Sequence, residues 1–238
     1  MRYIQSIVLL IVVCCTGVSA QSLSGLGIKG GINYSRLSES GTMQGKTDFI
    51  TQYMLGAYSE IELFNFLFLR YELFYAVRGT SRAIASSARQ NNGDQTDWSF
   101  TTTRNISLIE PVLLAHFPVH TAGQFRFHVF TGASLGVLVS ASSTIDGFYD
   151  NEPYYETRND RSSYLPLDPG LLIGAGIDYR FTTVQITADV RYVHGLMNIW
   201  DRGEQYAPTI LLQENESNED GIPRMHSRTI SLILGFGI

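Results

Sequence analysis

Apolar side chains occupy every second position in eight separate segments of the chain. The segment at 124–140 shows this most clearly, because its apolar residues alternate with Arg126, His128 and several glycines and serines. A period of two is typical of a β-strand with one apolar and one polar face. The eight segments cover residues 26–35, 51–63, 67–78, 101–117, 124–140, 170–181, 184–192 and 229–238. The pattern therefore predicts eight strands.

The connections between these segments alternate between short and long. Short connections lie around Asn65, at 118–123 and at Thr182, whereas long polar connections cover residues 38–48, 81–99, 142–166 and 195–226. Outer-membrane barrels have this asymmetry, with short periplasmic turns and long extracellular loops. We therefore predict an all-β fold, an eight-stranded antiparallel up-and-down transmembrane β-barrel in the outer membrane.

A soluble lipid-carrying barrel of the lipocalin type would show the same period, with its apolar face turned inward. Two features favour an apolar exterior instead. Glycines lie on the polar face, where a narrow barrel interior needs small residues. Aromatic residues gather at the short-turn end, as in an interfacial girdle: Phe64, Phe66, Phe117, Phe125 and Phe181. We therefore place the apolar faces against lipid and keep the soluble carrier as an alternative.

The N-terminus has the layout of a cleavable secretion signal. Arg2 precedes an apolar stretch at 7–13, and small residues around Ala20 provide a cleavage site. The apolar stretch is shorter than the about 20 residues that a membrane-spanning helix needs. We expect a signal peptide at 1–20 and one barrel domain at 21–238. Both cysteines lie within the signal, so the mature chain is expected to have no disulfide.

Several segments resemble the PorT-like family of outer-membrane β-barrel proteins of Bacteroidetes. The opening LGIKGGINYSRL at 26–37 is similar to the family's first strand. Its last three strands are similar to GAGIDYR at 174–180, ADVRYVHGL at 188–196 and RTISLILGF at 228–236. The resemblance covers essentially the whole mature chain and implies a barrel in the outer membrane. It implies little chemistry, although the name-giving member is associated with secretion of exported proteins.

Charged residues of both signs lie on the polar faces of neighbouring predicted strands. The interior of an eight-stranded barrel is only wide enough for side chains to fill it. We therefore expect these charges to pair and plug the lumen rather than to line an ion path or form an acid–base pair. The predicted lumen charge network contains Lys29, Glu60, Arg70, Glu72, Arg78, Asp178, Arg180, Asp189 and Arg191.

Glu110 and Pro111 depart from the family pattern, which places the acidic residue two positions before the proline. Simple alternation puts Glu110 on the same face as Leu108 and Val112, towards lipid, where a carboxylate is unfavourable. A proline also lacks one donor of the strand ladder and is typical of a bulge, which could turn Glu110 inward. We therefore expect a bulge in the fourth strand at Glu110 and Pro111.

No motif points to catalysis, a metal site or a cofactor. A serine, a carboxylate and the histidines His194 and His226 could meet near the outer rim, which leaves a lipid-modifying enzyme as an alternative, but without a diagnostic motif. No histidine pair has the spacing of a helical metal site. The acidic outer loops lack the ligand spacing of a calcium loop and are interpreted as a solvated surface. We expect no catalytic residues, no metal and no cofactor.

The composition also narrows the partners. Only 16% of residues are charged and the net charge is -5, so the chain offers no basic stripe for nucleic acid. We expect a monomeric barrel in outer-membrane lipid, with a periplasmic or extracellular protein partner at its rim or long loops. Its predicted role is an interaction, assembly or envelope component, with a link to protein secretion as one possibility.

Overall fold

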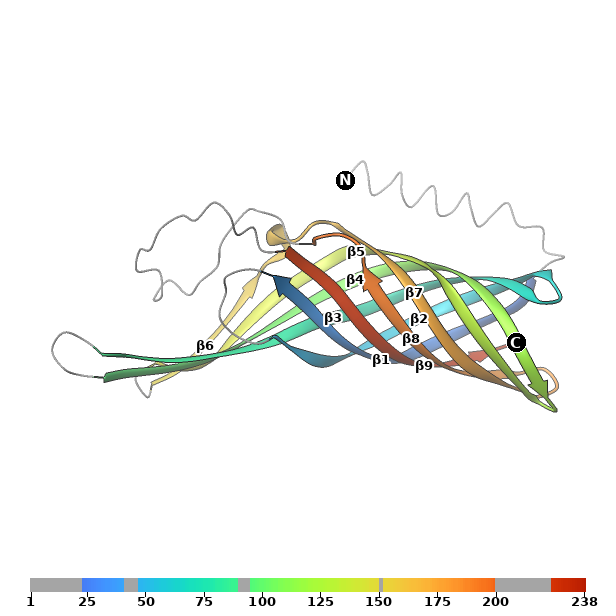
Figure 1. Cartoon of the computed structure of the whole chain (residues 1–238), viewed down its shortest axis with the longest axis horizontal. Helices are drawn as coiled ribbons and strands as arrows, with labels where there is room; N and C mark the ends of the chain where they lie inside the picture. The colour runs from blue at the N-terminus through green and yellow to red at the C-terminus, as the bar shows by residue number, and fades with distance from the viewer. Residues whose placement is uncertain (1–22, 41–46, 90–94, 150–151, 200–223) are drawn as a thin grey trace.

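Nine β-strands make up most of the described part of the computed structural model (Figure 1). They are β1 (Leu23–Ser40), β2 (Thr47–Phe64), β3 (Leu67–Arg89), β4 (Gln95–Ala122), β5 (Phe125–Tyr149), β6 (Glu152–Asn159), β7 (Leu167–Arg180), β8 (Gln185–Gly195) and β9 (Arg224–Gly237), with a short 3-10 helix η2 (Arg161–Ser163) before β7. The structure describes residues 23–40, 47–89, 95–149, 152–199 and 224–238. The predicted signal peptide and most of the connection at 195–226 lie outside the described residues.

Eight of the strands form a closed ring. Gly31 in β1 lies opposite Met54 in β2 on one side and opposite Ile233 in β9 on the other. The ring order is β1-β2-β3-β4-β5-β7-β8-β9, and all neighbours are antiparallel. A closed ring leaves no unpaired strand edge within the hydrocarbon layer, as a strand-based membrane span requires. The predicted eight-stranded barrel is confirmed.

The apolar faces of the strands point outward. Leu55, Ile173 and Leu234 are 61–63% exposed, whereas Lys29 and Arg70 are at most 1% exposed. This arrangement suits a barrel surrounded by lipid and contradicts the soluble-carrier alternative, which needs an apolar interior face throughout. No helix among the described residues is long and apolar enough to cross a membrane.

Two of the predicted long loops consist largely of strand, which corrects the sequence-based prediction. β3 and β4 remain paired as far as Arg89 and Gln95, and β5 continues to Tyr149. Beyond the barrel, β6 pairs with β5 over residues 142–149, on the side where β7 pairs with β5 inside the barrel. These segments form a sheet, here called the protruding sheet (residues 80–89, 95–105, 142–149 and 152–159), which extends well past the other strands (Figure 1). Outside lipid, polar residues occupy both faces of a strand, so the period of two disappears from the sequence.

The inner face of β4 is mostly apolar, which the sequence analysis assigned wrongly. Leu108, Glu110, Val112 and Leu114 are all at most 3% exposed and share the inward face. The β4 ladder keeps one register with β3 through Glu110, and its register with β5 is the same on both sides of Glu110. The predicted bulge at Glu110 and Pro111 is therefore wrong. The register shift lies nearby, where β5 gains one residue at Val139.

Side chains fill the lumen in alternating polar and apolar layers. The central apolar layer consists of Met54, Phe74, Ala76, Val112, Leu114, Phe130, Leu172, Val193 and Ile233. The outer apolar layer, towards the long connections, consists of Leu37, Ile106, Leu108, Leu138, Ala141, Tyr164, Ile199 and Met225. An eight-stranded barrel is narrow enough to be closed by such layers.

Candidate functional site

A cluster of charged side chains and two histidines occupies the half of the lumen nearest the short turns. We call it the inner cluster; its residues are Lys29, Glu60, Arg70, Glu72, His116, Arg126, His128, Asp178, Asp189 and Arg191, all at most 5% exposed. They come from β1, β2, β3, β4, β5, β7 and β8. Each lies at an inward position of its strand, so the period of two brings them together once the ring closes.

Direct ion pairs connect the inner cluster. The Lys29 Nζ lies 2.6 Å from the Glu72 Oε1 and 2.7 Å from the Asp189 Oδ2. The Arg191 guanidinium donates to the other Glu72 oxygen. Buried charges persist only when they are paired and hydrogen-bonded. The Lys29 ammonium therefore pairs with two buried carboxylates at once, those of Glu72 and Asp189.

Two other arginines of the cluster, Arg70 and Arg126, pair with the remaining carboxylates. The Arg70 Nε donates to the Glu60 Oε2 at 2.7 Å, and the Arg126 Nη2 lies 2.7 Å from the Asp178 Oδ2. The cluster thus contains four basic side chains and four carboxylates. Arg191 also lies 5.5 Å from the ring centre of Phe74, so the cluster ends against the central apolar layer. This layer isolates the charges from the outer half of the lumen.

A second ionic group lies beyond the central apolar layer. Arg78 contacts the Glu110 Oε1 at 2.5 Å and the Asp168 Oδ2 at 3.0 Å, and the Ser227 hydroxyl donates to Asp168 at 2.8 Å. Arg78 was predicted to belong to one network with Lys29 and Arg70. The structure instead places it in a separate group with two carboxylates that the predicted network did not contain.

Arg180 lies outside both groups, contrary to the predicted network. It is the last residue of β7, at the short-turn rim, where its exposed side chain donates from Nε to the Gln185 Oε1 at 3.2 Å. Strand alternation assigned it correctly to the polar face. Its depth along the barrel depends on the stagger between strands, which alternation does not contain.

Sequence reasoning missed three members of the inner cluster: His116, Arg126 and His128. Arg126 and His128 share the polar face of β5 with small residues, which is the signal that could have identified them. His116 follows Leu114 on an inward face that is mostly apolar, so alternation gave no such signal. The two imidazole rings lie 4.3 Å apart, because His116 pairs with Phe130 and thereby lies diagonal to His128.

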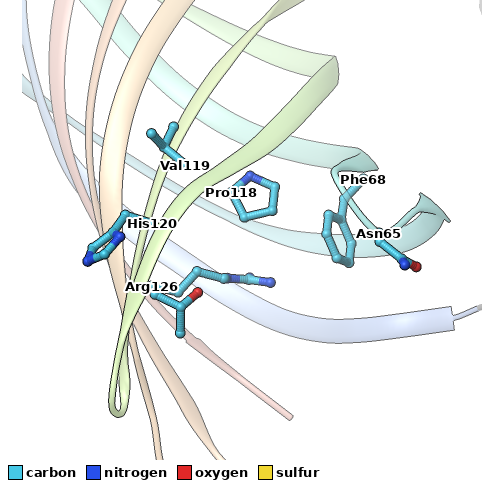
Figure 2. A pocket seen from close by; sticks show the side chains of 7 residues that line it. Asn65, Phe68, Pro118, Val119, His120 and Arg126 are labelled. Carbon is cyan, nitrogen blue, oxygen red and sulfur yellow. The ribbon is translucent and has the colours of Figure 1, made fainter.

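A hollow of about 330 Å³ opens at the short-turn end, next to the inner cluster (Figure 2). Its lining includes Asn65, Phe68, Pro118, His120 and Arg126. The Arg126 guanidinium lies 5.3 Å from the ring centre of Phe68. These two side chains separate the hollow from the buried histidines.

The residues considered for a lipid-modifying enzyme do not assemble into a catalytic group among the described residues. Ser227 points into the lumen and donates directly to Asp168. His194 instead lies beside Tyr192 on the outward side of β8, with 6.4 Å between the ring centres. Asp201 lies outside the described residues. The barrel wall therefore separates this histidine from the serine.

The protruding sheet presents aromatic and charged side chains on the face that continues the lumen wall. Phe100 packs edge-on against Tyr154 with 5.6 Å between ring centres, and Trp98 lies 5.8 Å from Phe100. The Arg158 Nη2 donates to the Glu156 Oε2 at 2.8 Å. The hydrogen bond from Arg158 holds the pKa of Glu156 below its usual range, and the hydrogen bond to Glu156 raises the pKa of Tyr154.

Comparisons with known proteins agree with this architecture. A family model described as the outer membrane protein beta-barrel domain matches residues 19–201, which include β1 to β8. Comparison with curated proteins gives no match.

Solved structures of outer-membrane proteins are similar to the chain. Neisserial surface protein A shares 11% identity over 88% of this chain and 95% of that chain, with a TM-score of 0.38. Ail, the attachment invasion locus protein of Yersinia pestis, shares 14% identity over 90% and 98%, with a TM-score of 0.31. The outer membrane protein OprG from Pseudomonas aeruginosa shares 11% identity over 91% and 95%, with a TM-score of 0.38.

Proposed function

This chain belongs to the outer membrane protein beta-barrel domain family, and from that premise we propose that it is a non-enzymatic envelope protein. In this proposal, the barrel is a sealed anchor in the outer membrane, and the protruding sheet is the surface that binds an extracellular protein partner. The proposal takes the barrel as a monomer, since its ring of strands closes without a strand from a second chain.

The filled lumen is the observation that supports this proposal most strongly. A solute would have to pass the inner cluster and two apolar layers, and Phe74, Leu114, Ile106 and Leu108 in those layers are at most 1% exposed. Ions would also find no water-lined route, because the ionic groups in the lumen are separated by apolar layers. A transport role therefore has no path through the described residues, which favours a role at the ends of the barrel.

The protruding sheet supports placing the binding surface at the end of the barrel with the long connections. Its four strand segments continue beyond the barrel. Aromatic side chains lie on its outer face, among them Phe148, which is 56% exposed, and Tyr155, which is 72% exposed. Exposed aromatic side chains surrounded by polar residues are typical of protein-binding surfaces. The resemblance to PorT-like barrels supports a narrower version, in which the partner is a component of protein secretion.

The sealed lumen is tested by conductance. We expect the purified barrel in planar lipid bilayers to show no ion channels above the background of the detergent alone. A stable conductance that rises when the lumen is widened and disappears when it is blocked would contradict the proposal. Swelling of liposomes in sugar solutions provides the same test for neutral solutes.

The surface is tested by shortening the protruding sheet. Ala83 and Thr101 are partners in the β3–β4 ladder, so an Asn-Gly turn can join them in place of residues 84–100. We expect this variant to fold, with heat-modifiable migration on a gel, but to fail to restore the phenotype of a deletion strain. The matched control places Asn-Gly at residues 123–124, in the short β4–β5 turn. Full complementation by the shortened variant, or failure of the control, would move the working surface to the periplasmic rim.

A further inference from the structure

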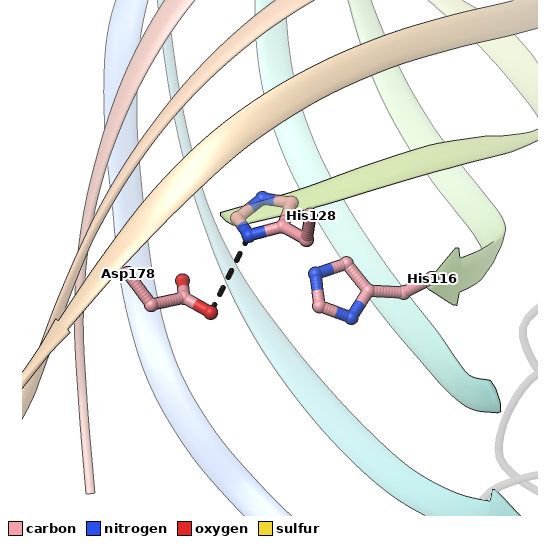
Figure 3. Close-up of side chains that lie close together, drawn as sticks. All are labelled: His116, His128 and Asp178. Carbon is pink, nitrogen blue, oxygen red and sulfur yellow. Dashed lines mark ion pairs between the residues drawn. The ribbon is translucent and has the colours of Figure 1, made fainter. Parts of the chain in front are cut away.

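We propose that the inner cluster contains a binding site for one divalent transition-metal cation, held by His116, His128 and Asp178. These side chains come from β4, β5 and β7 and point towards one another inside the barrel (Figure 3). A ring nitrogen of each histidine and a carboxylate oxygen of Asp178 all lie within 4.8 Å of one another. The sequence predicted no metal site, because the two histidines meet only through the pairing of β4 with β5.

Three ring nitrogens at this position have no hydrogen-bond partner. They are Nδ1 and Nε2 of His116 and Nδ1 of His128. The His116 residue is 0% exposed and the His128 residue 2%. A buried polar atom without a partner is destabilising, and an unobserved ion is one of the explanations for such atoms. A cation bound among them would satisfy one nitrogen of each ring.

The surrounding carboxylates orient the rings as outer partners of a metal site do. The His128 Nε2 lies 2.8 Å from the Asp189 Oδ1, so a proton on Nε2 leaves a lone pair on Nδ1. That Nδ1 lies 3.4 Å from the Asp178 Oδ2. Two ligand atoms at metal distances of roughly 2.0–2.2 Å in a tetrahedral site are separated by about 3.3–3.6 Å. The observed separation therefore fits a shared cation.

His116 has a similar outer partner. Its Nδ1 lies 3.5 Å from the Glu60 Oε2, too far for a good hydrogen bond but on the side away from a metal bound at Nε2. Metal-binding histidines commonly have a carboxylate behind the second ring nitrogen. Both histidines of the proposed site are thus backed by a carboxylate.

The charges of the inner cluster select the kind of cation. Four basic side chains balance four carboxylates, and Arg70 and Arg126 lie near His116. The site therefore lacks the excess negative charge that attracts Ca²⁺ or Mg²⁺, which also prefer oxygen ligands. Two imidazoles and one carboxylate suit Zn²⁺, and also Ni²⁺ or Cu²⁺. We take Zn²⁺ as the cation that fits this ligand set best.

The hollow at the short-turn end provides an approach to the site. Phe68 lines the hollow and lies edge-on against His116, with 6.1 Å between ring centres. Arg126 also lines it and binds Asp178. Phe68 and Arg126, both drawn in Figure 2, are thus the side chains of the hollow that contact the proposed ligands.

Metal titration of the untagged full chain tests the site. The barrel is extracted in detergent, treated with a chelator and then dialysed against Zn²⁺ or Co²⁺ alone. We expect one tightly held Zn²⁺ per chain by mass spectrometry and visible absorption bands of tetrahedral Co²⁺. His116→Gln should weaken binding by about tenfold or more. His120→Gln is the matched control, because His120 lies on the same strand and is exposed at the rim of the hollow.

The outcomes separate a metal from a trapped water molecule. His116 makes no hydrogen bond, so His116→Gln should fold, as checked by heat-modifiable migration, even where His128→Gln does not. Equal Zn²⁺ retention by the wild-type chain and His116→Gln would overturn the proposal and assign the unpartnered nitrogens to buried water. Displacement of Zn²⁺ by millimolar Ca²⁺ would overturn it as well.

Discussion

Lys29 and Glu72 form a buried ion pair of 2.6 Å between β1 and β3, two strands that are not neighbours in the ring. The pair crosses the lumen past β2, and Lys29 reaches Asp189 in β8 on the other side at 2.7 Å. The ladder hydrogen bonds connect only adjacent strands. The inner cluster therefore links distant parts of the ring from inside, and its loss should destabilise the barrel as a whole.

Replacing Lys29 by methionine should be strongly destabilising. The change leaves Glu72 and Asp189 buried without their shared cation, which costs about 3–5 kcal/mol for a broken buried pair. Urea unfolding in lipid vesicles, followed by gel migration, measures this. Arg180→Met is the control, since Arg180 is exposed at the rim, and should change stability by no more than about 0.5 kcal/mol. Equal effects of the two changes would contradict the role of the cluster.

The inward face of β4 makes a prediction for two consecutive leucines. Leu114 is 0% exposed inside the barrel, and Leu114→Ala should cost about 2–5 kcal/mol because it leaves a cavity. Leu113 is 43% exposed on the outside, and Leu113→Ala should cost only about 1–2 kcal/mol because lipid fills the space. The same unfolding measurement compares them. A larger effect at Leu113 would reverse the orientation described for β4.

Gly176 should not tolerate a methyl group. A Cβ at this position would lie 2.2 Å from the Asp189 Oδ1 and 2.5 Å from the His128 Nε2, inside the contact between them. Gly176→Ala should therefore destabilise the barrel by about 1–3 kcal/mol through overpacking. Gly30→Ala is the comparison, because its Cβ would meet only the Leu55 side chain at 3.4 Å and the Met54 carbonyl at 3.7 Å. Unchanged stability of Gly176→Ala would show that the cluster is less closely packed than described.

The protruding sheet should respond to acid through Glu156. The hydrogen bond from Arg158 lowers the pKa of Glu156. The ionised carboxylate therefore stabilises the protruding sheet at pH values above the ordinary pKa of glutamate, and this stabilisation is lost as the pH falls through the lowered pKa. A carboxyl NMR titration should show the Glu156 pKa returning to the usual range in Arg158→Gln. Tyr154→Phe should raise it less, because the hydrogen bond from Arg158 is the largest cause of the shift. An unchanged pKa in Arg158→Gln would exclude this pairing in solution.

Local sequence was sufficient for the parts of the fold that depend on one strand at a time. A side chain's face follows directly from its position in a period-two segment, so the outward apolar surface and the inward positions of Lys29, Glu72 and Asp189 could be predicted. The rule failed for β4, because Leu108, Val112 and Leu114 on one face are as apolar as Ile109, Leu113 and Ala115 on the other. Simple alternation then put Glu110 towards lipid, and a bulge was needed to turn it inward, whereas a regular strand already points it at Arg78 in the lumen.

The amino-acid sequence by itself determined the number of barrel strands, the direction of the faces of every barrel strand except β4 and the asymmetry of their connections, because each follows from residues that are neighbours along the chain. Only the tertiary structure decided which inward side chains meet. The register and stagger of the strands decide which of these side chains are close to one another. They separate Arg78 and Arg180 from the inner cluster and bring His116 beside His128. The protruding sheet was decided in the same way, since its strands outside lipid are held by pairing between segments rather than by a pattern within them.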